Sequence, residues 1–141
     1  MEKSTEELLN IMKNQKSYTD FFTDYVGELN FRSLSEYLTF LLEEKKLKKN
    51  DVISESNLDK NYAYQIFSGT KKNPSRDKLL MIAFGMRLSL NETCKLLKIA
   101  GLADLYVRDP RDSIIIYCLQ KNKSLMETNI DLVNYGVDAL E

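Results

Sequence analysis

The chain has 141 residues, enough for one hydrophobic core, and its 43% apolar and 29% charged residues are typical of a globular protein. It contains no histidine, which excludes Ser-His-Asp triads and histidine metal sites, and its 5 Gly and 2 Pro argue against a turn-rich β architecture. The net charge of -1 hides an uneven distribution, because residues 45–80 hold nine basic and four acidic side chains whereas residues 1–44 hold four and nine.

The N-terminal stretch, MEKSTEELLNIMKNQ, has no cationic region followed by an apolar one, and no later segment is long and apolar enough to cross a membrane. We therefore expect a cytoplasmic protein that makes no membrane contact. Because its acidic residues are scattered and mostly occupy helix starts, we expect no catalytic residue, no metal site and no cofactor.

Helix starts are marked by the pattern Ser-x-x-Glu, in which the serine hydroxyl accepts from the third amide and the glutamate accepts from the serine amide. This capping pattern begins at Ser4, Ser33, Ser89 and Ser124. Together with the spacing of the apolar residues, it predicts an all-α fold. The expected helices cover residues 5–14, 18–27, 34–46, 49–56, 59–68, 75–86, 90–100, 111–121 and 125–135.

Two helices joined by a tight turn are predicted in KNDVISESNLDKNYAYQIFS, residues 49–68. The apolar residues Val52, Ile53, Leu58, Ala63 and Ile66 are spaced so that both helices can share one seam, which is the helix-turn-helix pattern. The turn needs a residue that tolerates a positive φ, and Asn57 meets that need. Asp59 follows it, in a position to cap the second helix.

The outward face of the second helix is polar. With Leu58, Ala63, Ile66 and Phe67 turned inward, the outward residues are Lys60, Asn61, Tyr64, Gln65 and Ser68. Asn and Gln can pair with adenine through two hydrogen bonds in a major groove, and Lys can donate to guanine or phosphate. The surrounding lysines add the positive charge that a polyanion requires, although a plain solvated face would also be polar.

An internal repeat organises the C-terminal half. Residues 76–105 align without gaps on residues 111–140, with nine identities in thirty positions. Each unit is expected to be a helical hairpin whose second helix begins at a serine cap and ends at a glycine, Gly101 or Gly136. The repeat therefore predicts that SIIIYCL, residues 113–119, is helical, although the run taken alone could be a strand. Cys94 and Cys118 lie in apolar helical stretches, so we expect core packing rather than a disulfide.

Residues 34–98 resemble the lambda-repressor-like, XRE-type helix-turn-helix domain, a five-helix bundle. The resemblance is carried by Asn57 and Leu58, the polar helix DKNYAYQ, Ile66 to Gly69, the spacer TKKN with Pro74 and Ser75, and DKLLMIA at residues 77–83. It implies a transcriptional regulator, most simply a repressor, with residues 1–32 as an N-terminal helical extension, 33–100 as the DNA-binding domain and 101–141 as an appended hairpin on the same body.

The resemblance also implies how double-stranded DNA would be bound. The helix at residues 59–68 would enter the major groove, where Lys60, Asn61, Gln65 and Tyr64 would meet bases, Tyr64 through either a thymine methyl or a sugar. Contacts to the DNA backbone would come from a second group of residues, namely Lys48, Lys49, Asn50, Ser68, Thr70, Lys71 and Lys72. A homodimer would fit a palindromic operator.

A second interpretation remains open at this stage. The same bundle could have lost its DNA contacts and act as a protein-protein interaction module or antitoxin-like adaptor, using Tyr62, Tyr64 and the acidic N-terminal region. Salt dependence separates the two, because phosphate contacts weaken steeply with ionic strength and a tyrosine-centred protein interface weakens much less.

Overall fold

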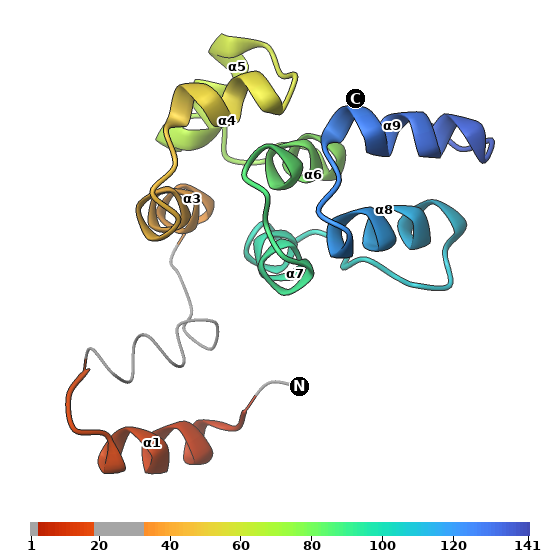
Figure 1. The fold of residues 1–141 in the computed structure, drawn as a ribbon. Coiled ribbons are helices and arrows are strands. Elements are labelled where there is room, and N and C mark those ends of the chain that lie inside the picture. Colours follow the sequence, from red (N-terminus) through yellow and green to blue (C-terminus); the bar gives the residue numbers. More distant parts are fainter. Residues whose placement is uncertain (1–2, 19–32) are drawn as a thin grey trace. The chain divides into compact units, whose positions relative to one another are not determined.

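The computed structural model describes residues 3–18 and 33–141, and these residues form helices and no strands (Figure 1), which confirms the all-α prediction. The expected helix at residues 18–27 lies outside the described residues except for Tyr18. Within the described part, no helix has the length and apolarity that a membrane span requires. The helices are α1 (Thr5–Asn14), α3 (Leu34–Glu44), α4 (Lys49–Glu55), α5 (Lys60–Ser68), α6 (Arg76–Gly85), α7 (Leu90–Ile99), α8 (Pro110–Gln120) and α9 (Leu125–Asn134).

The chain divides into two compact units, residues 1–30 and residues 31–141. In the first unit, α1 is capped by Ser4, whose hydroxyl accepts from the Glu7 amide at 3.1 Å. No residue of α1 is buried. The second unit holds the other seven helices of the described chain and its hydrophobic core.

Helix α6 is the centre of the second unit. It contacts α4, α7 and α9, and every residue from Leu79 to Gly85 is buried as a result. Gly85 is what lets α4 approach, since a Cβ atom there would overlap the Ser56 hydroxyl and lie 2.7 Å from the Val52 carbonyl oxygen. Because real Cβ atoms do not come that close to backbone oxygen, the α4–α6 contact depends on glycine at this position.

The predicted caps explain where most helices begin. Ser89 and Ser124 form complete capping boxes with Glu92 and Glu127, in which each glutamate accepts from its serine amide and each serine hydroxyl from its glutamate amide. Ser33 makes the serine half of the same arrangement, accepting from the Glu36 amide at 3.1 Å. These local hydrogen bonds satisfy amides that a helix start would otherwise leave unpaired.

The two repeat units, α6–α7 and α8–α9, exchange ion pairs. Arg76 donates to both carboxylate oxygens of Asp112 at 2.9 and 2.8 Å, and Arg111 donates to both oxygens of Asp77 at the same distances. Each arginine takes its partner from the other unit, and α6 contacts α9 as α8 contacts α7. Such reciprocity is the mark of a two-fold relation, so the hairpins pack as a pseudo-symmetric pair.

The same symmetry extends to the backbone. The Arg76 guanidinium also donates to the carbonyls of Ala103 and Asp104 at the end of its own unit, and Arg111 does the same to Asp138 and Ala139. Each arginine therefore ties the end of its own hairpin to the start of the other hairpin. The helical prediction for residues 113–119 is confirmed by α8.

Both cysteines are free, with Cys118 buried and Cys94 half-buried. Burial, together with a hydrogen bond to Asp104, raises the pKa of the Cys94 thiol to about 12. The thiolate is the reactive form of cysteine, so Cys94 is held in its unreactive form. The expected core packing is confirmed for Cys118, which is buried, whereas Cys94 is only half-buried.

Candidate nucleic-acid interface

The turn between α4 and α5 is built by three neighbouring residues. Ser56 is buried and its hydroxyl donates to the Val52 carbonyl at 2.6 Å, which closes the end of α4. Asn57 follows with φ of 53°, as the sequence predicted for the turn residue. Asp59 then caps α5 by accepting from the Tyr62 amide at 3.0 Å, also as predicted.

The inner face of α5 packs into the core. Ala63, Ile66 and Phe67 are buried, in agreement with the predicted inward face. At the C-terminal end, the Ser35 hydroxyl on α3 donates to the Phe67 carbonyl at 2.6 Å. Gly69 ends the helix with φ of 87°, a left-handed conformation that favours glycine. Ser35 thus helps to hold α5 in place, and no motif in the sequence indicates this role.

The outer face of α5 presents three of the four predicted base-reading residues. Lys60, Asn61 and Gln65 are exposed. The predicted backbone-contacting residues of the following loop, Ser68, Thr70, Lys71 and Lys72, are exposed as well.

The loop after α5 is held by hydrogen bonds close to the helix end. The Lys71 amide donates to the Gln65 carbonyl at 2.9 Å, and the hydroxyls of Ser68 and Thr70 lie 3.0 Å apart. These bonds keep the lysine-bearing loop beside the last turn of α5.

Tyr64 differs from the other three, because it is half-buried and bridges α5 to the start of α4. Its hydroxyl donates to the Asn50 side-chain oxygen. The ammonium groups of Lys49 and Lys60 each lie 6.0 Å from the centre of its ring. Such cation–π contacts are worth about 0.5–1 kcal/mol at exposed sites. Tyr64 therefore positions two lysines and one asparagine of the candidate site.

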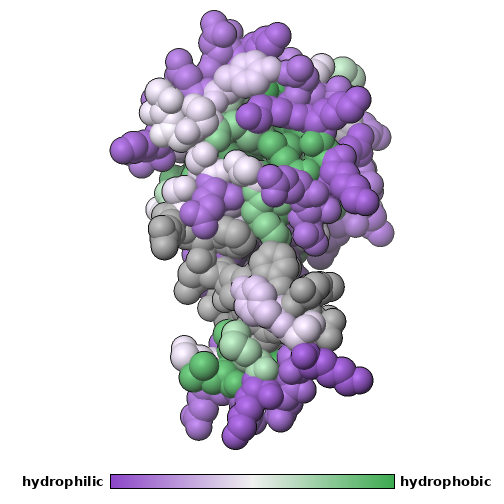
Figure 2. All heavy atoms as spheres, turned by 90° about the vertical axis from the view of Figure 1, so that its left-hand side faces the viewer, coloured by the Kyte–Doolittle hydropathy of each residue, from purple (hydrophilic) through white to green (hydrophobic). Residues whose placement is uncertain are grey.

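The positive charge comes from three segments of the chain. Lys48 and Lys49 begin α4, Lys60 begins α5, and Lys71 and Lys72 lie in the following loop; all five are exposed. The Lys71 ammonium lies 5.9 Å from the ring centre of half-buried Tyr62. Figure 2 shows a largely hydrophilic surface with apolar side chains visible between the polar ones on the side of the second unit that it presents.

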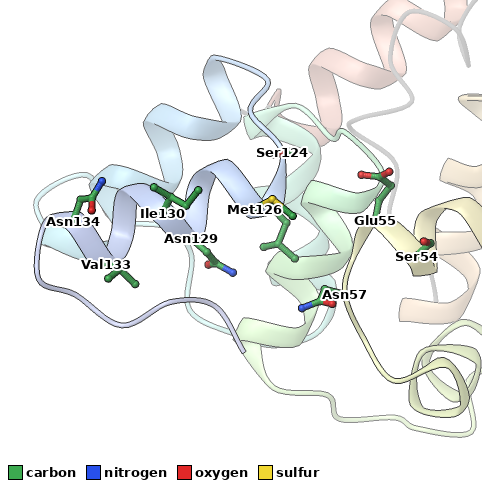
Figure 3. Close-up of a pocket in the computed structure, with 10 residues that line it drawn as sticks. Ser54, Glu55, Asn57, Ser124, Met126, Asn129, Ile130, Val133 and Asn134 are labelled. Carbon is green, nitrogen blue, oxygen red and sulfur yellow. The ribbon is translucent and has the colours of Figure 1, made fainter.

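A second surface feature adjoins the turn between α4 and α5. A groove of about 740 Å³ runs between the end of α4 and the exposed side of α9. Figure 3 shows its two sides, with Ser54, Glu55 and Asn57 facing residues of α9. The α9 side includes Met126, Ile130 and Val133, which the sequence prediction did not single out. Their spacing of four and three residues is the signal that could have identified them.

No protein-family model, curated protein or solved structure matches this chain. Its function is therefore inferred from its own residues and their geometry.

Proposed function

We propose that this protein is a sequence-specific DNA-binding transcriptional regulator, acting as a repressor, that inserts α5 into the major groove. One observation carries the proposal: the exposed face of α5 holds Lys60, Asn61 and Gln65, while its opposite face is fixed in the core. A rigid helix with readout-capable side chains pointing outward is what direct recognition of base edges requires.

In this proposal, helices α3 to α7 correspond to the five helices of a lambda-repressor-like bundle. Asn61 and Gln65 lie four residues apart and so project from the same side of α5. Each can accept from and donate to one adenine, whereas Lys60 donates to guanine. Tyr64 supports the neighbouring side chains of the site, because its hydroxyl already donates to Asn50.

The backbone contacts in the proposal come from both sides of α5. Lys48, Lys49 and Asn50 would meet one stretch of phosphates, and Ser68, Thr70, Lys71 and Lys72 would meet another. Lysines supply affinity that is independent of sequence, and the release of counterions from DNA makes that affinity fall as salt rises. Two copies of the chain on a palindromic operator would place their α5 helices about 34 Å apart, one turn of DNA.

The test is selection of binding sites from a random pool of duplexes by the purified full-length chain, at low and at physiological salt. Enrichment of a motif with two-fold symmetry is the expected result. Only salt-labile binding with no enriched motif would overturn the proposal. In that case the exposed surface of α5 and its loop would be assigned to a protein partner, with the chain acting as an interaction module or antitoxin-like adaptor.

A further inference from the structure

The exposed face of α9 carries an apolar stripe. Met126, Ile130 and Val133 are 74%, 55% and 61% exposed, which is unusual for three apolar side chains on one side of a ten-residue helix. All three line the groove beside α4 (Figure 3), so the stripe forms one wall of a concave surface. An exposed apolar surface with no packing role in its own fold is a candidate for contact with another molecule.

The internal repeat supplies a direct comparison. The positions of α7 that correspond to Met126, Ile130 and Val133 are Asn91, Lys95 and Lys98. Both hairpins share their caps, their arginine pairs and their buried leucines at 97 and 132, so the hairpin itself does not require apolar residues at these three positions. The stripe is therefore a property of α9 alone, and its role lies outside the packing of the hairpin.

We propose that the groove binds α9 of a second copy of this chain. If two α9 helices lie antiparallel across a two-fold axis at Ile130, then Met126 faces Val133 of the other copy and Ile130 faces its own counterpart. The stripe is thus complementary to itself, which an interface between identical copies requires. A helix of ten residues is about 15 Å long, so a single pair of α9 helices buries all three residues on both sides.

The lining of the groove carries little charge. Among the residues that line the groove only Glu55 is charged. The polar remainder, which includes Ser54, Asn57 and Asn129, suits the hydrated rim of an interface and offers little attraction to a highly charged partner.

The partner helix would also contact the turn of the helix-turn-helix, because Asn57 lines the same groove. Dimerisation would then brace the turn that sets the direction of α5. This consequence for DNA binding rests on the function proposed above, whereas the interface itself rests only on the surface of α9 and the groove.

The experiment is sedimentation equilibrium of the full-length chain without DNA. The wild type should be dimeric. A variant that carries the α7 residues at the α9 positions, Met126→Asn with Ile130→Lys and Val133→Lys, should have a dimer dissociation constant about 100-fold or more higher. Val107→Lys is the matched control, since Val107 is 66% exposed and lies outside the groove, and it should leave the dimer unchanged. A monomeric wild type, or a triple variant that dimerises as well as the wild type, would overturn the proposal.

A cross-link keeps the proposal testable if the triple variant does not fold. Ile130→Cys places one thiol beside the axis in each copy, so mild oxidation should give a disulfide-linked dimer. The wild type, with Cys94 half-buried and Cys118 buried, should give none. Absence of the Ile130→Cys link overturns the proposed geometry. Since neither readout involves DNA, a dimer that binds no operator would count against the proposed function and leave the interface standing.

Discussion

Arg76 and Asp112 are joined by two parallel hydrogen bonds across the two repeat units, and Arg111 and Asp77 repeat the arrangement in the opposite direction. The two pairs have the same geometry and differ in burial. The Asp112 side chain is 8% exposed, whereas that of Asp77 is 25% exposed. The chain thus contains two copies of one interaction in two different environments.

Removing the arginine from each pair should therefore have unequal effects. Arg76→Met leaves the Asp112 carboxylate buried without its partner and should lower the free energy of unfolding by about 2–4 kcal/mol. Arg111→Met leaves the more exposed Asp77, which water can solvate, and should cost about 1–2 kcal/mol. Chemical denaturation followed by circular dichroism at neutral pH measures both. Equal losses, or the reverse order, would contradict the role assigned to burial.

Acid should weaken both pairs. Burial alone raises the pKa of Asp77 and of Asp112, but hydrogen bonds from Arg111 and Arg76, with their charges, outweigh it, so both pKa values lie below the ordinary 3.8. A carboxyl whose pKa is lower in the folded state stabilises the fold above its ordinary pKa and loses that contribution as pH falls through its folded value. The free energy of unfolding should therefore change little through these groups between about pH 5 and 7, and fall below about pH 4.

The control for this prediction is Asp112→Asn. Asp131 and Glu127 also have lowered pKa values, through Lys123 and through Ser124 respectively, so the wild-type curve alone cannot isolate the exchanged pairs. The asparagine variant should be less stable at pH 7 and should lose less stability between pH 5 and 3 than the wild type. Parallel curves for the two proteins would show that Asp112 does not titrate as the ion pair requires.

Gly85→Ala should disrupt the contact between α4 and α6. Alanine in place of glycine stabilises an open helical position by about 1 kcal/mol, but here its Cβ atom would meet the Ser56 hydroxyl and the Val52 carbonyl. We expect a net loss of about 1–3 kcal/mol in the free energy of unfolding. Adding Ser56→Ala removes only the hydroxyl overlap, so it should restore part of the loss in a double-mutant comparison. A stabilised Gly85→Ala protein would show that the helices are not in close contact.

In the proposed complex, single substitutions distinguish residues that read bases from residues that bind phosphates. Asn61→Ala should cost about 1–3 kcal/mol at the selected operator and relax the preference at one base pair. Lys72→Ala should weaken all duplexes alike and reduce the dependence of affinity on salt. Asn91→Ala on α7 is a control on an exposed asparagine of another helix, and operator affinity should be unchanged. Titration of labelled duplexes at several salt concentrations gives all three results. An Asn61→Ala protein with an unaltered site preference would remove Asn61 from the readout.

The helices were predictable because the signals that start them are local. Ser89 and Ser124 lie three residues from the glutamates that complete their caps, and Asn57 supplies the positive φ of the turn by its own chemistry. The exchanged ion pairs were not predictable, although the repeat contains both Arg-Asp sequences. Adjacent residues do not face each other on a helix, and only the placement of the two hairpins decides which arginine meets which carboxylate.

Part of the candidate site was predictable, because the signals for that part are also local. Lys60, Asn61 and Gln65 follow from the periodicity of α5, which leaves them outward once Ala63 and Ile66 are buried. Tyr64 was less accessible to this reasoning, since its bridge to Asn50 spans fourteen residues and depends on how closely α4 and α5 approach. The close contact at Gly85 could not be predicted either, because a glycine within a helix does not indicate which neighbouring element will pack against it.

The exchange between the hairpins has a consequence for how such a chain can arise. Two separate, identical hairpins would make the same pairs across a two-fold axis, each arginine meeting the aspartate of the other molecule. A tandem duplication of the hairpin gene segment therefore provides a complete set of mutually fitting contacts at once, with no later adaptation of one half to the other. Selection is then free to act on the surfaces that this junction leaves uncovered, where Asn91, Lys95 and Lys98 stand in one copy and Met126, Ile130 and Val133 in the other.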